Sequence, residues 1–251
     1  MKQKFLAMMG IIAILSLCLA GIVNAAKEGY GFQIATGAEI TVDGDVGAGE
    51  WDDSYKDFLY NGWTMSTSFF RDKWGSAPSE GWLIEIPTDI TSDETDIFKF
   101  SVDTLQDGGS APQADDFLIT ITGHSGTVTM QQGTGTTWGA SSAVSGTDYL
   151  VASSMASGHW VIEIYLDKAG ALAMQYNNNV RIGTYDVSTG NALCWPPDSA
   201  ANVPDTYGTG TTEFGDPIPE GLTIGVMILM SFVAVVVSTR YYRKRPKWQN
   251  W

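Results

Sequence analysis

Cysteine is scarce in this chain. Of the two cysteines in 251 residues, Cys18 lies in an N-terminal apolar run, so Cys194 has no partner in the remainder of the sequence. An internal disulfide is therefore excluded, and the fold must depend on its apolar core. The absence of a C-x-x-C-H motif also excludes covalently attached haem.

Residues typical of catalytic centres are few. The two histidines are His124, in a predicted turn, and His159, just before a predicted strand. No G-x-S-x-G, H-E-x-x-H or glycine-rich phosphate loop occurs. A lone cysteine such as Cys194 usually behaves as a small buried hydrophobe. We therefore predict that the protein is not an enzyme.

Positive charge is nearly missing from the main part of the chain. Residues 27–216 contain seven Lys and Arg against 27 Asp and Glu, a net charge of −20. This balance excludes nucleic acid and anionic lipid surfaces as partners of that region. It favours an exported protein that stays soluble through self-repulsion.

The N-terminal segment is typical of a secretory signal. Lys2 and Lys4 precede an apolar run over residues 5–23, and small residues around Ala25 provide a cleavage site. We predict a signal peptide over residues 1–25, with an uncleaved N-terminal anchor as the alternative.

The C-terminal segment predicts a membrane anchor. Residues 222–238 carry no charge, and with their flanks they reach the length that a helix needs to cross a bilayer. A transmembrane helix over 220–239 would be followed by a basic tail over 240–251, containing Arg240, Arg243, Lys244, Arg245 and Lys247. Because basic residues stay on the cytoplasmic side, we expect a single-pass protein of the cell membrane with its large domain outside.

Residues 26–199 have the pattern of an all-β domain. Apolar and polar residues alternate over 98–102, 117–122, 160–166 and 180–184, which predicts half-buried strands. The fold class predicted is an antiparallel β-sandwich, with one short helix over 167–175 and a proline-containing linker over 200–219. Glu163 and Arg181 are interpreted as an ion pair between adjacent strands.

An ordered set of motifs resembles a known group. Ile40-Thr41-Val42-Asp43-Gly44 and Glu50-Trp51 are similar to the opening of family 9 carbohydrate-binding modules and the related DOMON-like sandwiches, which include the haem-binding subunit of ethylbenzene dehydrogenase. Segments 96–103, 115–119, 159–164, 181–186 and 195–208 resemble the later strands of that group in the same order. The resemblance supports the sandwich, whereas function has to be argued from the site.

The first functional hypothesis is a binding role toward a glycan or another component of the cell envelope. A sugar ring needs an exposed aromatic face with polar neighbours. Trp51 and Trp160 are assigned to the core, and the candidate platforms, each with a packing role as its alternative, are Trp63, Trp74, Trp82, Trp138 and Trp195. A structural envelope protein without a small ligand is the second hypothesis.

A redox partner carrying b-type haem is the third hypothesis. The haem-binding relatives use Met and Lys as axial ligands, and the residues of these types here are Met65, Met130, Met155, Met174, Lys99 and Lys168. They suggest no pair.

The C-terminal segment has a second interpretation. Pro219-Glu220-Gly221, followed by an apolar span and a basic cluster, is similar to the sorting signals processed by exosortases and archaeosortases. Cleavage at this motif is the alternative to a retained helix.

Acidic residues form two candidate calcium sites. The opening segment, with Asp43, Asp45, Glu50, Asp52 and Asp53, is interpreted as a turn with solvated acids, because its spacing does not match an EF-hand. If the strands pair as in the resembling group, Asp103 and Asp115, with Asp116, lie at the ends of neighbouring strands. They could bind calcium or cap the loop between the strands.

Overall fold

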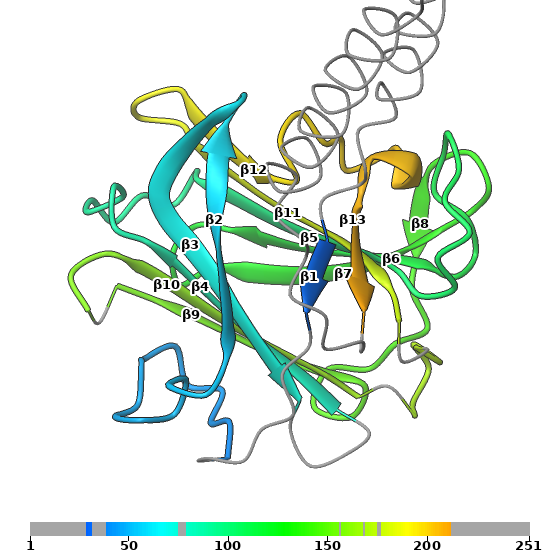
Figure 1. The fold of residues 1–251 in the computed structure, drawn as a ribbon, viewed down its shortest axis with the longest axis horizontal. Coiled ribbons are helices and arrows are strands. Elements are labelled where there is room, and N and C mark those ends of the chain that lie inside the picture. Colours follow the sequence, from blue (N-terminus) through cyan, green and yellow to red (C-terminus); the bar gives the residue numbers. More distant parts are fainter. Residues whose placement is uncertain are drawn as a thin grey trace, which may run out of the picture. The chain divides into compact units, whose positions relative to one another are not determined.

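The computed structural model describes residues 29–31, 39–74, 79–155, 157–167, 169–174 and 177–211. These residues form thirteen strands and one 3₁₀ helix (Figure 1). The strands are β1 (Gly29–Gly31), β2 (Tyr55–Asn61), β3 (Thr64–Trp74), β4 (Ser79–Ile86), β5 (Ile97–Asp103), β6 (Asp116–Thr122), β7 (Thr127–Gly133), β8 (Trp138–Ala140), β9 (Tyr149–Ser154), β10 (Trp160–Asp167), β11 (Asn179–Asp186), β12 (Asn191–Trp195) and β13 (Gly208–Thr211), and the helix is Pro204–Thr206.

The strands follow one continuous path that folds back on itself. Their order is β8-β7-β6-β5-β11-β12-β2-β3-β4-β10-β9, while β13 pairs with β11 and with β1. A single residue pair, Cys194 with Tyr60, joins β12 to β2 and so connects the two halves. Among the described strands, only β1 and β13 pair in parallel, so the predicted all-β antiparallel fold is confirmed.

The core lies between the two halves of the folded sheet. Phe98 and Phe100 of β5 point inward from one half, and their rings contact Trp160 and Trp82 from the other half at centroid distances of 6.3 and 5.2 Å. Figure 1 shows β2 and β3 crossing in front of β5 and β7. The period-two pattern of the sequence therefore marks the inward face, and burial of that face drives folding.

The segment before β2 covers the outer face of the second half. Trp51 packs with Leu83 of β4 and Val161 of β10, and Ile40 and Val46 border this small cluster. Because both faces of β4 and β10 are covered, these strands are buried along nearly their whole length.

Three sequence predictions in this region need correction. The predicted helix over 167–175 is replaced by turns in its described residues after β10. The Asp167 carboxylate accepts a hydrogen bond from the Ala169 amide, and Ala173 takes a positive φ of 45°.

Glu163 and Arg181 do not lie on adjacent strands, since β10 pairs with β4 and β9 whereas β11 pairs with β5. The predicted linker over 200–219 contains β13, so the packed domain extends at least to Thr211.

The predicted signal peptide, transmembrane helix and basic tail lie outside the described residues. The chain divides into a unit over residues 1–212 and a second over 213–251. Within the part of the chain that the structure describes, no helix has both the length and the apolar character needed to span a membrane.

Candidate functional site

A pocket of about 540 Å³ lies on the outer face of β5, β11 and β12. Its lining comes from these strands, from the turn between β2 and β3, and from the loop after β12. The lining residues are Asn61, Gly62, Ile97, Lys99, Arg181, Gly183, Thr184, Tyr185, Ala192, Leu193, Cys194, Asp198 and Ser199.

The pairing register explains the floor of this pocket. Gly183, at its centre, pairs with Lys99 of β5 on one side and with Cys194 of β12 on the other. Side chains directly opposite one another share a face of the sheet. Since Phe98, Phe100 and Ile182 point into the core, Lys99, Gly183 and Cys194 point outward into the pocket.

Arg181 forms the charged end of the floor. Its Nε donates a hydrogen bond to the Ser199 carbonyl at 3.2 Å, whereas its Nη1 is buried and has no hydrogen-bond partner among the described residues. The guanidinium lies over Gly183, where an added Cβ would approach Nη1 to 2.4 Å and Nη2 to 2.6 Å. Burial lowers the pKa of Arg181 from its ordinary value, while the nearby Cys194 and Tyr207 raise it.

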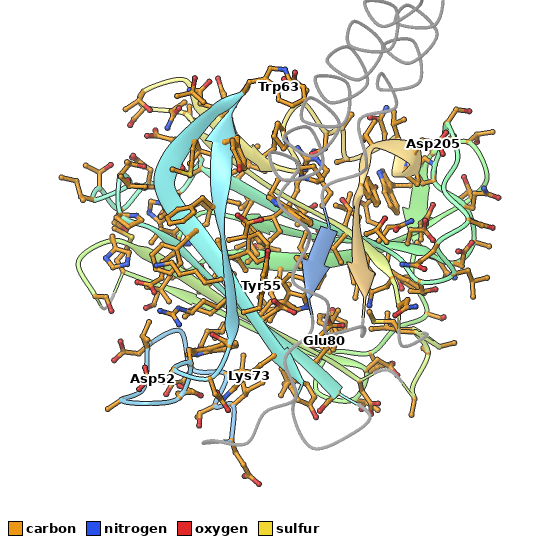
Figure 2. The ribbon with its side chains drawn as sticks, in the orientation of Figure 1. Asp52, Tyr55, Trp63, Lys73, Glu80 and Asp205 are labelled. Atoms are coloured by element: carbon orange, nitrogen blue, oxygen red, sulfur yellow. The ribbon has the colours of Figure 1, made fainter. Side chains whose placement is uncertain are left out.

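Trp63 stands beside this pocket. It follows Gly62, a lining residue with a φ of 55°, in the two-residue turn between Asn61 and Thr64. Figure 2 shows Trp63 at the tip of the β2–β3 hairpin, and 74% of the residue is exposed. Tyr185, which lines the pocket, is 43% exposed. The pocket is thus accompanied by two accessible aromatic side chains.

The structure does not gather the other predicted tryptophans at this pocket. Trp82 and Trp195 are fully buried, so the prediction that either is a sugar platform is wrong. Their rings pack against Phe70 at 5.7 and 5.1 Å. Trp138 is half-buried on β8, at one end of the strand order. Trp74 ends β3, and its side chain lies outside the described set. Trp51 and Trp160 are in the core, as predicted.

The candidate haem ligands are also dispersed. Met174 is buried in the core, and Met130 and Met155 are partly buried against the core. Lys99 instead lines the pocket. Met65 is exposed on β3.

A carboxylate cluster lies where β5 ends and β6 begins. Asp103 pairs with Asp116 across these strands, which confirms that the acids sit at neighbouring strand ends. Oxygens of Asp103, Asp107 and Asp115 lie within 4.8 Å of one another. Asp107 thus joins the predicted Asp103 and Asp115, whereas the predicted Asp116 is not in the convergent set.

The oxygens of this cluster suit a hard cation. One Asp103 oxygen accepts hydrogen bonds from Gly108 N and Asn179 Nδ2, but Asp103 Oδ1 and Asp115 Oδ2 are buried without a hydrogen-bond partner among the described residues. Burial, together with the charges of Asp103, Asp115 and Asp107, raises the pKa of Asp116 to about 7, against the lowering effect of the hydrogen bond from Gln113 N. Uncompensated buried carboxylates cost free energy, and calcium is coordinated by oxygens of this type. Asp103, Asp107 and Asp115 would hold the ion.

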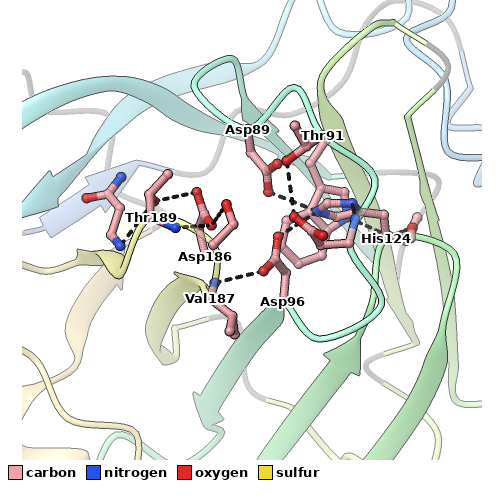
Figure 3. A network of polar contacts seen from close by, with 12 residues as sticks. Asp89, Thr91, Asp96, His124, Asp186, Val187 and Thr189 are labelled. Carbon is pink, nitrogen blue, oxygen red and sulfur yellow. Dashed lines mark hydrogen bonds and ion pairs between the residues drawn. The ribbon is translucent and has the colours of Figure 1, made fainter.

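A second group joins His124 with Asp89 and Asp96 (Figure 3). His124 Nδ1 accepts the Asp93 amide at 2.9 Å, so the proton of the neutral ring resides on Nε2. Nε2 lies 2.9 Å from Asp89 Oδ2 and 3.2 Å from Asp96 Oδ2. A metal at Nε2 would require the ring proton on Nδ1, facing the Asp93 N–H. The group therefore fits a hydrogen-bonded clamp and does not fit a metal centre.

This clamp connects three parts of the domain. Asp96 Oδ1 accepts the Val187 amide at 2.8 Å, in the turn between β11 and β12. His124 lies in the β6–β7 turn, where its ring meets Trp160 edge-on at 4.5 Å. The sequence shows the acids and the histidine separately, but nothing in their spacing indicates that they meet.

The acidic opening segment forms a turn, as predicted. Asp45 N donates to Asp43 Oδ1 at 2.9 Å, and Gly47 N donates to Glu50 Oε2 at 3.1 Å. Glu163 fastens this segment to β10 by accepting hydrogen bonds from Asp43 N (3.0 Å), Gly44 N (2.8 Å) and Trp51 Nε1 (3.2 Å). Glu163 therefore anchors the opening segment to the sheet, in place of the ion pair predicted with Arg181.

Glu163 predicts an unusual pH dependence. Burial raises its pKa from the ordinary 4.5 to about 7, against the lowering effect of its three hydrogen bonds. The stability that this group contributes is fully present below pH 4.5 and is lost as the pH rises through about 7. We expect Glu163 to lower the free energy of unfolding in calcium-free buffer by about 2 kcal/mol between pH 5 and 7, and Asp116, whose pKa is also raised to about 7, acts in the same direction. Urea unfolding measures the fall, and Glu163→Gln should remove the Glu163 share of about 2 kcal/mol; an unchanged pH dependence in Glu163→Gln would contradict the assignment.

The known proteins to which this chain is similar share its fold. No protein-family model matches the chain, and no curated protein matches it. Among the solved structures similar to this chain are two of a family 9 carbohydrate binding module from Caldicellulosiruptor kristjanssonii, one in complex with glucose and one with cellotriose. They align with TM-scores of 0.54 and 0.53 at 12% identity, covering 75% and 74% of this chain and 99% and 96% of theirs.

Proposed function

We propose that this protein is a non-catalytic glycan-binding module. The observation that carries the proposal is a tryptophan, 74% exposed, beside a pocket of about 540 Å³ whose lining includes polar side chains. An exposed indole offers a flat apolar face to a sugar ring, while Asn61, Lys99 and Asp198 of the lining can hydrogen-bond with hydroxyl groups. The likeness in fold to modules solved with glucose and cellotriose supports the same role.

The proposed setting of the module is the outer surface of the cell membrane. Support comes from the sequence of the two ends, a signal-like N-terminus and an apolar C-terminal run followed by basic residues. In that setting the ligand would be an extracellular glycan or a component of the envelope.

Replacement of Trp63 by Ala should remove most of the binding. We expect the affinity of the full chain for a cellulose-type oligosaccharide such as cellotriose to fall about tenfold or more, the factor that 1.4 kcal/mol gives. Trp63 is exposed, so the folded state should be preserved. Isothermal titration calorimetry measures the affinity.

The matched control is Trp138→Ala. Trp138 is a half-buried tryptophan on β8, which does not line the pocket. Unchanged binding in this variant, beside a loss in Trp63→Ala, supports the pocket. An equal loss in both variants, or no binding of any glycan by the unaltered protein, would refute the proposed function.

A further inference from the structure

Two cations of the pocket form no ion pair in the part of the chain that the structure describes. Lys99 and Arg181 both line the pocket, and neither forms an ion pair with Asp or Glu among the described residues. By contrast, Lys73 is buried against Asp53 at 3.2 Å. In a region with a net charge of −20, two unpaired cations on one small surface require an explanation.

Their arrangement is built into the sheet. In the register of β5 with β11, Lys99 lies opposite Gly183, and Arg181 lies opposite Ser101, two residues along each strand. Both cations therefore project from the same outer face of the sheet. Gly183 leaves room for the guanidinium, and the Ser199 carbonyl holds its Nε. Nη1 is buried without a hydrogen-bond partner among the described residues, so the protein leaves the charge of the guanidinium without a full set of acceptors. Asp198, exposed among the lining residues, is the single acid there.

We infer that the pocket recognises a carboxylate-bearing sugar, a uronic-acid residue of an acidic glycan. This inference rests on the proposed function and specifies its ligand class. The carboxylate would lie between Lys99 and Arg181, because guanidinium and carboxylate groups match in geometry. The ring would lie toward Trp63. Since the surrounding charge repels polyanions at long range, recognition depends on this local contact, and a short oligosaccharide is the suitable probe.

The test compares two trisaccharides of the same linkage. Cellotriose is the neutral probe, and a β-1,4-linked trimer of glucuronic acid is the acidic one. Calorimetry on the full chain at physiological salt should give an affinity for the acidic trimer about tenfold or more above that for cellotriose. Lys99→Gln should abolish this preference, because the affinity for the acidic trimer falls about tenfold while that for cellotriose, which loses only a hydroxyl contact, falls less.

Two further variants make the result specific. Lys56→Gln removes the same charge from a different site, where Lys56 lies over the Phe69 ring at 3.5 Å, and should change neither affinity. Gly183→Ala places a Cβ where the guanidinium now lies, and should reduce the preference without removing a charge.

The outcomes separate the two proposals. Cellotriose binding that equals or exceeds binding of the acidic trimer overturns the inference and leaves the proposed function standing. Equal loss of the preference in Lys56→Gln and Lys99→Gln also overturns the inference, because net charge then decides the affinity. Acetate that displaces the acidic trimer at equal concentration overturns the sugar class. Binding of neither trisaccharide counts against both proposals.

Discussion

Substitution of His124 by Leu should lower the free energy of unfolding by about 2–3 kcal/mol, the cost of leaving a buried charged group without its hydrogen-bond donor. Leucine fills much of the same volume but donates no hydrogen bond. Asp89 and Asp96 would then remain buried without the Nε2–H that now lies 2.9 and 3.2 Å from them. Burial already raises the pKa of Asp89, against the hydrogen bond from His124. The midpoint of urea unfolding at an unchanged m value measures the loss.

The other histidine provides the control. His159 Nε2 lies 3.0 Å from Glu85, but the two side chains remain 18% and 17% exposed. His159→Leu should therefore cost no more than about 1 kcal/mol, because water still reaches the pair. The double variant His124→Leu, Asp89→Asn should lose less free energy of unfolding than the sum of the losses in the two single variants, because the two side chains contact each other. Equal effects of the two histidine substitutions would mean that the clamp contributes no more than a surface pair.

Calcium should stabilise the folded protein specifically. A single site gives a gain of about 2.7 kcal/mol in the free energy of unfolding at a hundredfold excess over the dissociation constant. The expected ligands are carboxylate oxygens of Asp103, Asp107 and Asp115, which converge within 4.8 Å. Asp103 and Asp115 each also have one buried oxygen without a hydrogen-bond partner among the described residues. Thermal unfolding with increasing calcium, after treatment with a chelator, measures the gain.

Screening of charge must be separated from binding at this site. Magnesium at matched ionic strength reports screening of the −20 net charge, since magnesium tolerates such irregular carboxylate sites poorly. Asp107→Asn and Asp115→Asn should abolish the calcium-specific gain, whereas Asp52→Asn, which removes an exposed acid of the opening turn, should retain it. If calcium and magnesium stabilise every variant equally, the stabilisation comes from screening of charge and not from a calcium site.

Sequence periodicity predicted the strands because burial on one face of a sheet has a period of two. Four predicted strands correspond closely to β5, β6, β10 and β11. Periodicity does not say which strands are neighbours, and this produced the error over Glu163 and Arg181. The same limit hid the pocket, whose floor exists only because β11 pairs with both β5 and β12.

Local composition was a poor guide to the tryptophans. Trp82 was predicted as a possible sugar platform, but it follows Gly81 within β4, where Ile40 and Trp51 pack against the glycine. An added Cβ at Gly81 would approach Ile40 to 2.1 Å. Trp195 precedes two prolines, yet it ends β12 and donates to Asp57 at 2.9 Å across the junction of the two halves. Glycine and proline mark a close approach as readily as an exposed turn.

The parallel pairing of β1 with β13 determines how the domain responds to tension. Gly29 and Thr211 lie at opposite ends of a pair in which Gly29 aligns with Thr209 and Gly31 with Thr211. A force that separates these two ends acts along the strands, so the hydrogen bonds between them resist together and are not opened one after another. Through β13 the strain continues into β11 at Asn179 and Val180, directly before Arg181. Pulling on the domain would therefore reach the floor of the pocket first.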